Sequence, residues 1–237
     1  MKKILCLIFP IFLLACQQES PEQTDLYLFL DYTEGQDYSQ RLESELDQII
    51  SLMQVDPKHN GNYGQVRIIP VHDIGSTPSK IVKLKAGKTG LESNPYVRKK
   101  EVDEFKQKLA KHIDHFNAQY QGQPLKASHI YYPLCKGINK LNRSDAQRKL
   151  VVIYSDMLEN SEIANLHRSK WSSKNINERL NEACSLEDLS DIEVHVVYPV
   201  SKQNDQKIRK AADFWEQYLV NKGLDGEHFH FETGLDI

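Results

Sequence analysis

The chain has 237 residues, of which 40% are hydrophobic, and its 30 Lys and Arg against 33 Asp and Glu give a formal net charge of -3. This composition excludes a disordered protein, which would combine low hydrophobicity with high net charge, and a small disulfide scaffold, which would hold far more cysteine. The acidic balance also argues against a nucleic-acid partner, because binding to phosphates needs a basic stripe. We therefore expect a folded protein that binds no nucleic acid.

The first 15 residues have the pattern of a secretory signal peptide. Lys2 and Lys3 precede an apolar run, Ile4–Leu14, which is too short for a membrane-spanning helix of about 20 residues. The run closes on the sequence LLAC, which resembles the lipobox of bacterial lipoproteins. The resemblance implies cleavage before Cys16 and acylation (palmitate) of Cys16; the alternative is ordinary secretion.

An acylated Cys16 would anchor the mature protein to a membrane of the bacterial cell envelope, since several acyl chains give the stable binding that one chain does not. The stretch after it is polar without an apolar period, so residues 16–24 are predicted to form the lipidated end and a flexible tether. Gln17 stands where an Asp retains some lipoproteins at the inner membrane. We therefore expect the outer membrane rather than the inner one.

Only two of the four cysteines are left for the folded protein, because Cys6 leaves with the signal peptide and Cys16 carries lipid. Cys135 and Cys184 are candidates for a disulfide, which an oxidising envelope compartment would permit. The alternative is that each is a small, separately buried apolar side chain. The sequence does not decide between the two.

The folded part opens with a strand and a helix. Asp25–Leu30 is a continuous apolar run, typical of a strand buried on both faces, and apolar residues from Leu42 to Met53 form one stripe of a helix. Two further strands are predicted at Val66–Val71 and Ile81–Lys85. Their linker is too short for a crossover helix, so we expect them to pair antiparallel.

The second half continues the alternation. A stripe from Val102 to Tyr120 predicts a long helix, and a further helix is expected from Ser128, as its cap, toward Leu141. The remaining predicted elements are a strand at Lys149–Tyr154, a short helix at Asn177–Cys184, a strand at Ile192–Val197, a helix striped from Ile208 to Leu219, and an edge strand at His228–Phe231. Residues 25–237 are thus predicted to form one three-layer, doubly wound α/β domain, whose sheet is mostly parallel with one antiparallel strand.

Polar side chains follow the two most strongly apolar strands. Asp31, Tyr32 and Thr33 come after the first strand, and Ser155 and Asp156 come after the strand at 149–154. Ligands of such sheets bind beyond the carboxyl ends of the strands, so these residues are predicted to line one crevice. Oxygen ligands suit a hard cation such as Mg²⁺.

This arrangement, from Asp25 to about Glu232, resembles a von Willebrand factor type A (vWA) domain. In that family an Asp-x-Ser-x-Ser loop, a distant Thr and a distant Asp form a metal-ion-dependent adhesion site, which binds a carboxylate of a partner protein. The resemblance implies that Asp31, Thr33 and Asp156 are metal ligands. The crevice would then bind a protein partner.

The match to the vWA motif is incomplete. Gly35 occupies the place of the second hydroxyl, and the distant Thr has two candidates, Thr89 and Thr77, of which spacing favours Thr89. Carboxylates at strand ends also cap helices without binding anything. The prediction is therefore a degenerate site that holds either Mg²⁺ or no cofactor.

Other motifs are weaker. Gly87–Thr89 lacks the earlier glycine of a phosphate-binding loop, and Asp31-x-Thr33 lacks the second carboxylate of the haloacid-dehalogenase phosphatases that it resembles. His228, His230 and Glu232 would share one face of a strand with spacing that could hold Zn²⁺, although a solvated polar face is the more ordinary interpretation.

No catalytic constellation is recognisable in the sequence, so we expect a binding module rather than an enzyme. The alternatives are a metal-dependent envelope hydrolase that uses Asp31 and Asp156, or a structural scaffold whose crevice is empty. The hydrolase would need a general base within hydrogen-bond reach and a closed pocket, and the sequence nominates neither.

Overall fold

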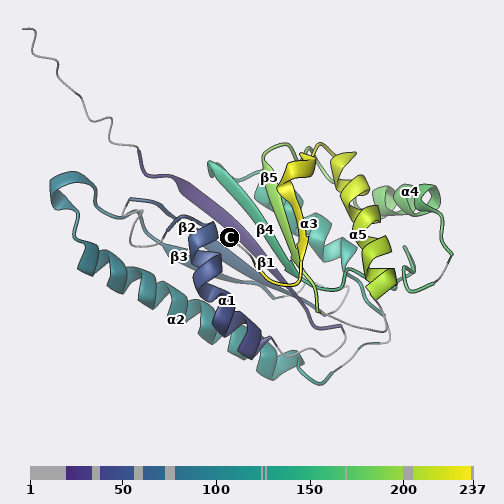
Figure 1. Cartoon of the computed structure of the whole chain (residues 1–237), viewed down its shortest axis with the longest axis horizontal. Helices are drawn as coiled ribbons and strands as arrows, with labels where there is room; N and C mark the ends of the chain where they lie inside the picture. Colours follow the sequence, from purple (N-terminus) through teal and green to yellow (C-terminus); the bar gives the residue numbers. More distant parts are fainter. Residues whose placement is uncertain are drawn as a thin grey trace, which may run out of the picture.

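The computed structural model describes residues 20–33, 38–55, 61–72, 78–123, 125, 127–168, 170–199 and 205–235. The predicted signal peptide, the predicted lipidation site Cys16, Gly35 and Thr77 lie outside the described residues. The described part has a central sheet with helices packed on both sides of it (Figure 1). This is the three-layer α/β architecture that the alternating pattern predicts.

Six strands form one sheet in the order β3-β2-β1-β4-β5-β6. Their bounds are β1 Gln23–Asp31, β2 Tyr63–Val71, β3 Lys80–Leu84, β4 Arg148–Tyr154, β5 Ile192–Val197 and β6 Phe229–Glu232. All neighbouring pairs are parallel except β2 and β3, which are antiparallel. The predicted fold class, the antiparallel pair and the edge strand are confirmed. β1 begins at Gln23, so the last two residues of the predicted tether belong to the sheet.

Within the described residues, five helices cover the two faces of the sheet. Their bounds are α1 Ser39–Leu52, α2 Pro95–Tyr120, α3 Tyr131–Asn142, α4 Ser173–Ala183 and α5 Asp205–Val220, with short 3-10 turns η1 Gly90–Glu92 and η2 Gly226–His228. Apolar side chains of α1 and α2 form one core with one face of the sheet, and those of α3, α4 and α5 form a second core with the other face.

β1 lies between these two cores. Leu26, Leu28 and Leu30 pack with α1 and α2, whereas Tyr27 and Phe29 pack with the opposite helices. Successive side chains of a strand point to opposite faces, so a strand covered on both sides must be apolar at every position. That requirement explains the uninterrupted apolar run in the sequence.

The prediction that Ser128 caps a helix is wrong. α3 begins at Tyr131 and has no side-chain cap of its own residues. Instead, the Glu159 carboxylate accepts hydrogen bonds from the N–H groups of Ile130 and Tyr131, both at 2.8 Å, and so satisfies two donors of the first helical turn. Ser128 forms an isolated backbone bridge with Asn160.

A disulfide joins Cys135, buried in α3, to Cys184 at the end of α4, with a Cα–Cα distance of 6.3 Å. Polar contacts run alongside it: the Asn139 side chain donates to the Ser185 carbonyl at 2.8 Å and accepts from the Glu187 N–H at 3.0 Å. The segment after α4 is therefore fixed to α3 by both covalent and hydrogen bonds.

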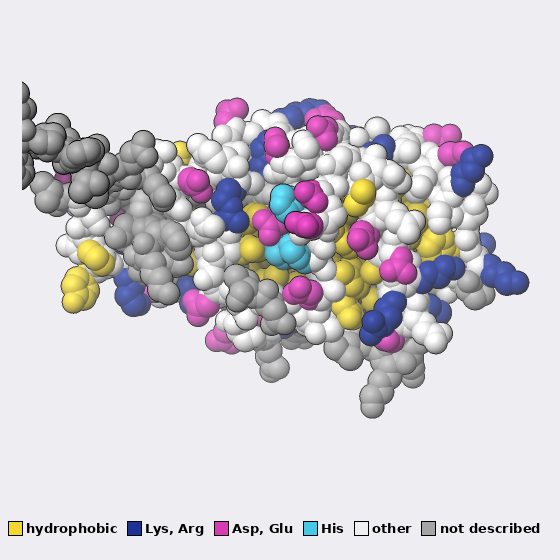
Figure 2. All heavy atoms as spheres, turned by 45° about the horizontal axis from the view of Figure 1, so that its top comes forward, with side chains coloured by type: hydrophobic (Ala, Val, Ile, Leu, Met, Phe, Trp, Pro, Cys, Tyr) yellow, Lys and Arg dark blue, Asp and Glu magenta, His cyan; other side chains and the backbone are white. Residues whose placement is uncertain are grey.

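The surface of the described part is charged with both signs. Figure 2 shows acidic and basic side chains scattered over one face, with histidines grouped among acidic side chains. Among the described residues, no helix is both long enough and apolar enough to cross a membrane.

Candidate functional site

The carboxyl ends of β1 and β4 place the predicted crevice residues side by side. These strands are parallel neighbours, with Leu30 opposite Tyr154, so Asp31 and Ser155 follow at the same edge. The Ser155 hydroxyl donates to Asp31 Oδ2 at 2.6 Å. The structure thus brings these two together, although 124 residues separate them in the chain.

Two further hydroxyl groups extend this contact into a chain of buried polar groups. Thr33 donates to Asp31 Oδ1 through its N–H at 3.0 Å and through its hydroxyl at 2.6 Å. The Ser128 hydroxyl donates in turn to Thr33 Oγ1 at 2.7 Å. Asp31, Thr33, Ser128 and Ser155 are all buried. Charge-assisted hydrogen bonds of this kind hold the carboxylate in one orientation.

Tyr32 does not line the crevice as predicted. Its side chain is fully buried in the core on the α2 side, where its hydroxyl donates to Asn117 Oδ1 at 2.7 Å. The reason is the alternation along the chain, since Tyr32 lies between two residues that face the polar cluster. Its role is to pack beneath the site.

Asp156 lies in the turn that follows β4. Its Oδ1 accepts the N–H of Leu158 at 2.9 Å, and the Ser155 hydroxyl accepts the N–H of Met157 at the same distance. Met157 has a positive φ of 57°, a backbone conformation that side-chain-bearing residues rarely adopt. The Trp215 indole holds this turn by donating to the Met157 carbonyl at 2.9 Å.

Glu159 is the functional candidate that the sequence reasoning missed. It is fully buried, and its Oε2 accepts the two N–H groups at the start of α3. Burial raises the pKa of this carboxyl to about 7, the Ser161 hydroxyl and the two N–H groups oppose the rise, and the charge of Asp31 adds to it. Two carboxyl groups therefore influence each other at this edge of the sheet.

The donor set of this polar cluster fits a hard cation. Asp31, Thr33, Ser128 and Ser155 offer only carboxylate and hydroxyl oxygens, which are ligands that Mg²⁺ accepts. Hydroxyl groups rotate, so protons that now point at Asp31 can turn away and leave oxygen lone pairs for a metal. Ser128 supplies the third hydroxyl, for which the sequence had nominated Thr89.

The prediction that Thr89 is a ligand is wrong, because Thr89 lies near the amino ends of the strands, whereas Asp31 lies at the carboxyl end of β1. A Cβ added to Gly61 would lie 2.8 Å from the Thr89 methyl group, and Gly61 comes just before β2. The start of β2 pairs with the start of β1, eight residues before Asp31, or about 26 Å along an extended strand. Thr89 therefore cannot join the Asp31 cluster.

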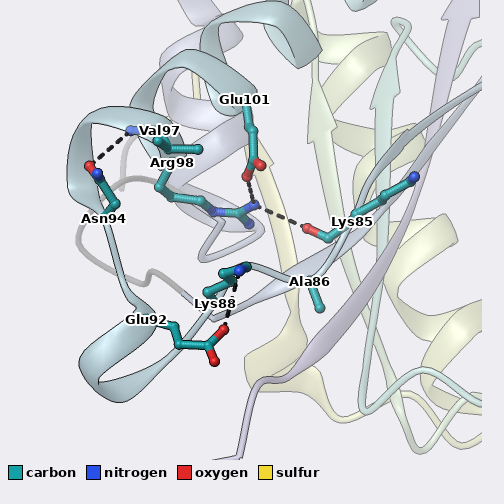
Figure 3. Close-up of a pocket in the computed structure, with 8 residues that line it drawn as sticks. All are labelled: Lys85, Ala86, Lys88, Glu92, Asn94, Val97, Arg98 and Glu101. Atoms are coloured by element: carbon teal, nitrogen blue, oxygen red, sulfur yellow. Dashed lines mark hydrogen bonds and ion pairs between the residues drawn. The ribbon is translucent and has the colours of Figure 1, made fainter.

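The segment that contains Thr89 borders a hollow of about 370 Å³, shown in Figure 3. The buried guanidinium of Arg98 forms one wall of it, donating to the Lys85 carbonyl at 3.0 Å, to Glu101 Oε2 at 2.9 Å, and to the Asn62 carbonyl. These bonds join the start of α2 to the end of β3 and to the segment before β2. Arg98 therefore acts as a structural clamp, which fixes the start of α2 to these two segments beside the hollow.

We expect Arg98→Ala to lower the free energy of unfolding by about 2–4 kcal/mol, because the variant loses a buried side chain and two partly buried carbonyl groups lose a charged donor. Urea denaturation followed by circular dichroism measures the change. Arg209→Ala is the matched control, since Arg209 is exposed on α5 and pairs with the exposed Asp205 one turn away. Equal stability of the two variants would contradict the clamp.

The sequence matches no protein-family profile and no curated protein. Among solved structures, the PilB minor pilin from Streptococcus sanguinis is similar with a TM-score of 0.51 and 10% identity in its D319A form, over 92% of this chain and 58% of that one. The pilus adhesin SpaC from Lactobacillus rhamnosus GG gives 0.49 and 13%, over 93% and 29%. Manganese-loaded TRAP protein from Plasmodium vivax gives 0.35 and 16%, over 81% and 63%.

The chain spans less than two thirds of each of these structures, and identities this low indicate a shared fold alone. The strand order and the single antiparallel pair define a mostly parallel α/β fold, which the described part shares with the PilB minor pilin.

Proposed function

We propose that this chain is a protein-binding module of the bacterial envelope, which engages a partner through the polar cluster at the ends of β1 and β4. The observation that carries the proposal is the buried chain of hydroxyl groups that orients Asp31. Such an arrangement costs stability unless it is satisfied by hydrogen bonds or by a ligand. A metal ion bound by Asp31 and these hydroxyl groups could in turn bind a carboxylate of the partner.

In this proposal Asp31, Thr33, Ser128 and Ser155 hold Mg²⁺ directly or through water, and Asp156 contributes from the adjoining turn. The bound ion supplies a positive charge that a carboxylate of the partner can ligate. The residues themselves orient the site and exclude water from beneath it, since Tyr32 seals the core below. Recognition therefore depends on one acidic side chain of the partner.

Attachment to the membrane is part of the proposal, on the strength of the lipobox-like sequence that ends at Cys16. Six residues separate Cys16 from β1, a reach of at most about 22 Å. The amino end of β1 would then face the membrane, and Asp31 lies at the other end of that strand. We infer that an outer-membrane anchor would present the cluster outward, to a partner in the envelope.

A binding role is preferred to hydrolysis. The carboxyl group with a raised pKa that feels the charge of Asp31, Glu159, is fully buried and caps α3, so it cannot reach a substrate as a general base. No imidazole contacts Asp31 or Ser155 in the hydrogen bonds of the described residues. We therefore propose that the cluster binds rather than catalyses.

Replacement of Asp31 by Asn tests the cluster. The amide keeps the size of the side chain and an acceptor oxygen, but it loses the charge that a hard cation needs. In isothermal titration of the full-length protein in detergent, we expect the Mg²⁺ affinity to fall at least tenfold, by analogy with the loss of a metal-site group.

Asp213→Asn, an exposed carboxylate of α5, is the control and should bind Mg²⁺ like the wild type. Cross-linking in intact cells, with and without EDTA, then checks whether partner capture follows metal binding. Equal Mg²⁺ binding by Asp31→Asn and the wild type would overturn the metal site, and equal capture by both would overturn the partner site.

A further inference from the structure

A second group of metal-binding side chains lies away from the Asp31 cluster, on strands β5 and β6. Glu193 and His195 are two residues apart on β5 and so share one face of it, and His230 is the register partner of His195 on β6. Val197, on the same face, packs with the core of α1 and α2. The three side chains therefore lie on the α1 and α2 side of the sheet, near its β6 edge; Glu193 and His230 are partly exposed, and His195 keeps 11% of its side chain exposed.

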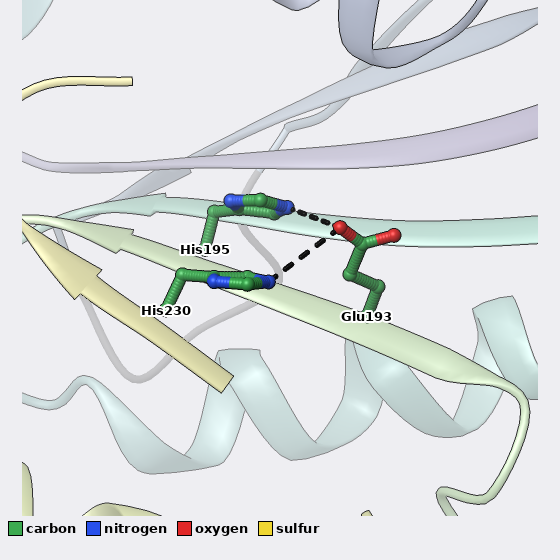
Figure 4. Close-up of side chains that lie close together, drawn as sticks. All are labelled: Glu193, His195 and His230. Carbon is green, nitrogen blue, oxygen red and sulfur yellow. Dashed lines mark hydrogen bonds and ion pairs between the residues drawn. The ribbon is translucent and has the colours of Figure 1, made fainter. Parts of the chain in front are cut away.

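The two imidazole rings point the same nitrogen at one carboxylate oxygen (Figure 4). His195 Nε2 lies 2.8 Å and His230 Nε2 lies 3.7 Å from Glu193 Oε1. The rings are stacked, with centroids 4.4 Å apart and an angle of 19° between their planes. One ligand atom from each residue lies within 4.8 Å of the other two.

A hydrogen bond explains only half of this geometry. His195 is at hydrogen-bond distance from Glu193, but His230 is too far for a strong bond to the same oxygen. Tetrahedral Zn²⁺, with bonds of about 2.0–2.2 Å to nitrogen and oxygen, needs ligand atoms about 3.3 Å apart. The observed 2.8 and 3.7 Å lie on either side of that value, so small side-chain rotations would complete the set.

We propose that Glu193, His195 and His230 bind a transition-metal ion, with Zn²⁺ as the best fit. Two imidazoles and one carboxylate suit Zn²⁺ far better than Mg²⁺, which prefers oxygen ligands in octahedral geometry. Three protein ligands leave a fourth position for water. The site is independent of the hard-cation cluster at Asp31 in both ligand chemistry and place.

A hollow lies beside Glu193, but neither His195 nor His230 is among the residues that line it. Glu193 borders a hollow of about 610 Å³, whose lining also includes Arg148 and His228. Arg148 Nη2 stands 3.8 Å from Glu193 Oε2 and leaves Oε1 to the two imidazoles.

The bound metal would join β6 to β5. β6 is a four-residue strand at the edge of the sheet, and each of its residues is only partly buried. Because His230 is on β6 and both other ligands are on β5, a metal that binds all three must hold the two strands in register. We therefore expect Zn²⁺ to raise the thermal midpoint of unfolding.

The test is titration of the metal-free, full-length protein with ZnCl₂ in detergent. We expect one ion per chain at this site, and intense visible absorption typical of tetrahedral coordination when Co²⁺ replaces Zn²⁺. His230→Ala and Glu193→Gln should each weaken Zn²⁺ affinity at least tenfold and abolish the thermal shift. His115→Ala, an exposed histidine of α2 outside the group, should keep both.

The variants are first compared by circular dichroism without metal, and His230→Ala, at the exposed edge, is the one best placed to keep the fold. Asp31→Asn should bind Zn²⁺ normally, so failure here is distinguishable from failure of the proposed Mg²⁺ cluster. Unaltered Zn²⁺ affinity in both His230→Ala and Glu193→Gln, or octahedral Co²⁺ spectra in the wild type, would overturn the proposal.

Discussion

Replacing Cys135 and Cys184 together by alanine is expected to lower the free energy of unfolding by about 4 kcal/mol. The disulfide closes a loop of 49 residues, and the loss of that constraint raises the chain entropy of the unfolded state by an amount that grows with loop length. Alanine is chosen because Cys135 is fully buried in the α3 core, where a serine hydroxyl would need a partner. The change is therefore expected to act on the unfolded chain.

Reduction of the wild type supplies the control for this prediction. In urea denaturation, the reduced wild type should unfold at the midpoint of the double variant, whereas the reductant should leave the double variant unchanged. The Asn139 contacts beside the disulfide persist in both proteins and should keep the native structure similar. A reduced wild type as stable as the oxidised one would refute the expected contribution.

The fold was predictable because burial leaves a strong mark on sequence. β1 and β4 are covered on both faces along Leu26–Leu30 and Leu150–Tyr154, so all of those positions are apolar, and the helices carry a stripe because they are covered on one face. The antiparallel pairing of β2 and β3 followed from a linker too short for a helix. Helix boundaries were less predictable: α4 begins at Ser173, four residues before the predicted start, since exposed first turns carry no apolar signal.

The site was predictable only in part. Asp31, Thr33, Ser155 and Asp156 could be nominated since they directly follow buried strands, whose ends meet at one edge of a parallel sheet. Ser128 lies in a loop, and its partner Thr33 is 95 residues away in the chain. A contact between residues so far apart leaves no periodic pattern in the sequence. Its position as a hydroxyl between two predicted helices suggested a cap, which is the ordinary role of serine there.

Glu159 and the His195 pair were missed for related reasons. The acidic residue four places after Ser155 looks like a surface group, and only the fold shows that it caps α3 from within the core. The sequence placed His230 beside His228 and Glu232 on one strand, but its closest imidazole comes from the neighbouring strand. Cross-strand partners require the register of the sheet, which a single sequence does not encode locally.

Glu159→Gln is expected to change how stability depends on pH. The folded-state pKa of Glu159 is raised to about 7 from 4.5, so between these two pH values the native state holds a proton that the unfolded state has released. The free energy of unfolding must then fall as the pH rises through this window. For a shift of this size the total is about 3 kcal/mol.

Glutamine removes this titration while keeping an oxygen to accept the two N–H groups of α3. We expect the variant to become more stable relative to the wild type as the pH rises from 4.5 to 7. Above pH 7 the difference in unfolding free energy should stay constant. Urea denaturation at half-unit pH intervals measures the curve. Glu187→Gln is the control, because Arg143 lowers the pKa of that exposed carboxyl, which gives no slope between pH 5 and 8.

The charge of Asp31 adds a second test of the same pair. Because that charge contributes to the raised pKa of Glu159, Asp31→Asn should move the pH-dependent loss of stability to lower pH, and the Asp31→Asn/Glu159→Gln double variant should show no loss in this window. If the curves of wild type and Asp31→Asn coincide, the two carboxyls titrate independently, and the polar cluster at the end of β1 acts without Glu159. A shifted curve would instead mean that the charge of Asp31 acts on Glu159. A cation bound at Asp31 would then favour the charged form of Glu159, and because Glu159 caps α3, occupancy of the crevice would be linked to the start of that helix.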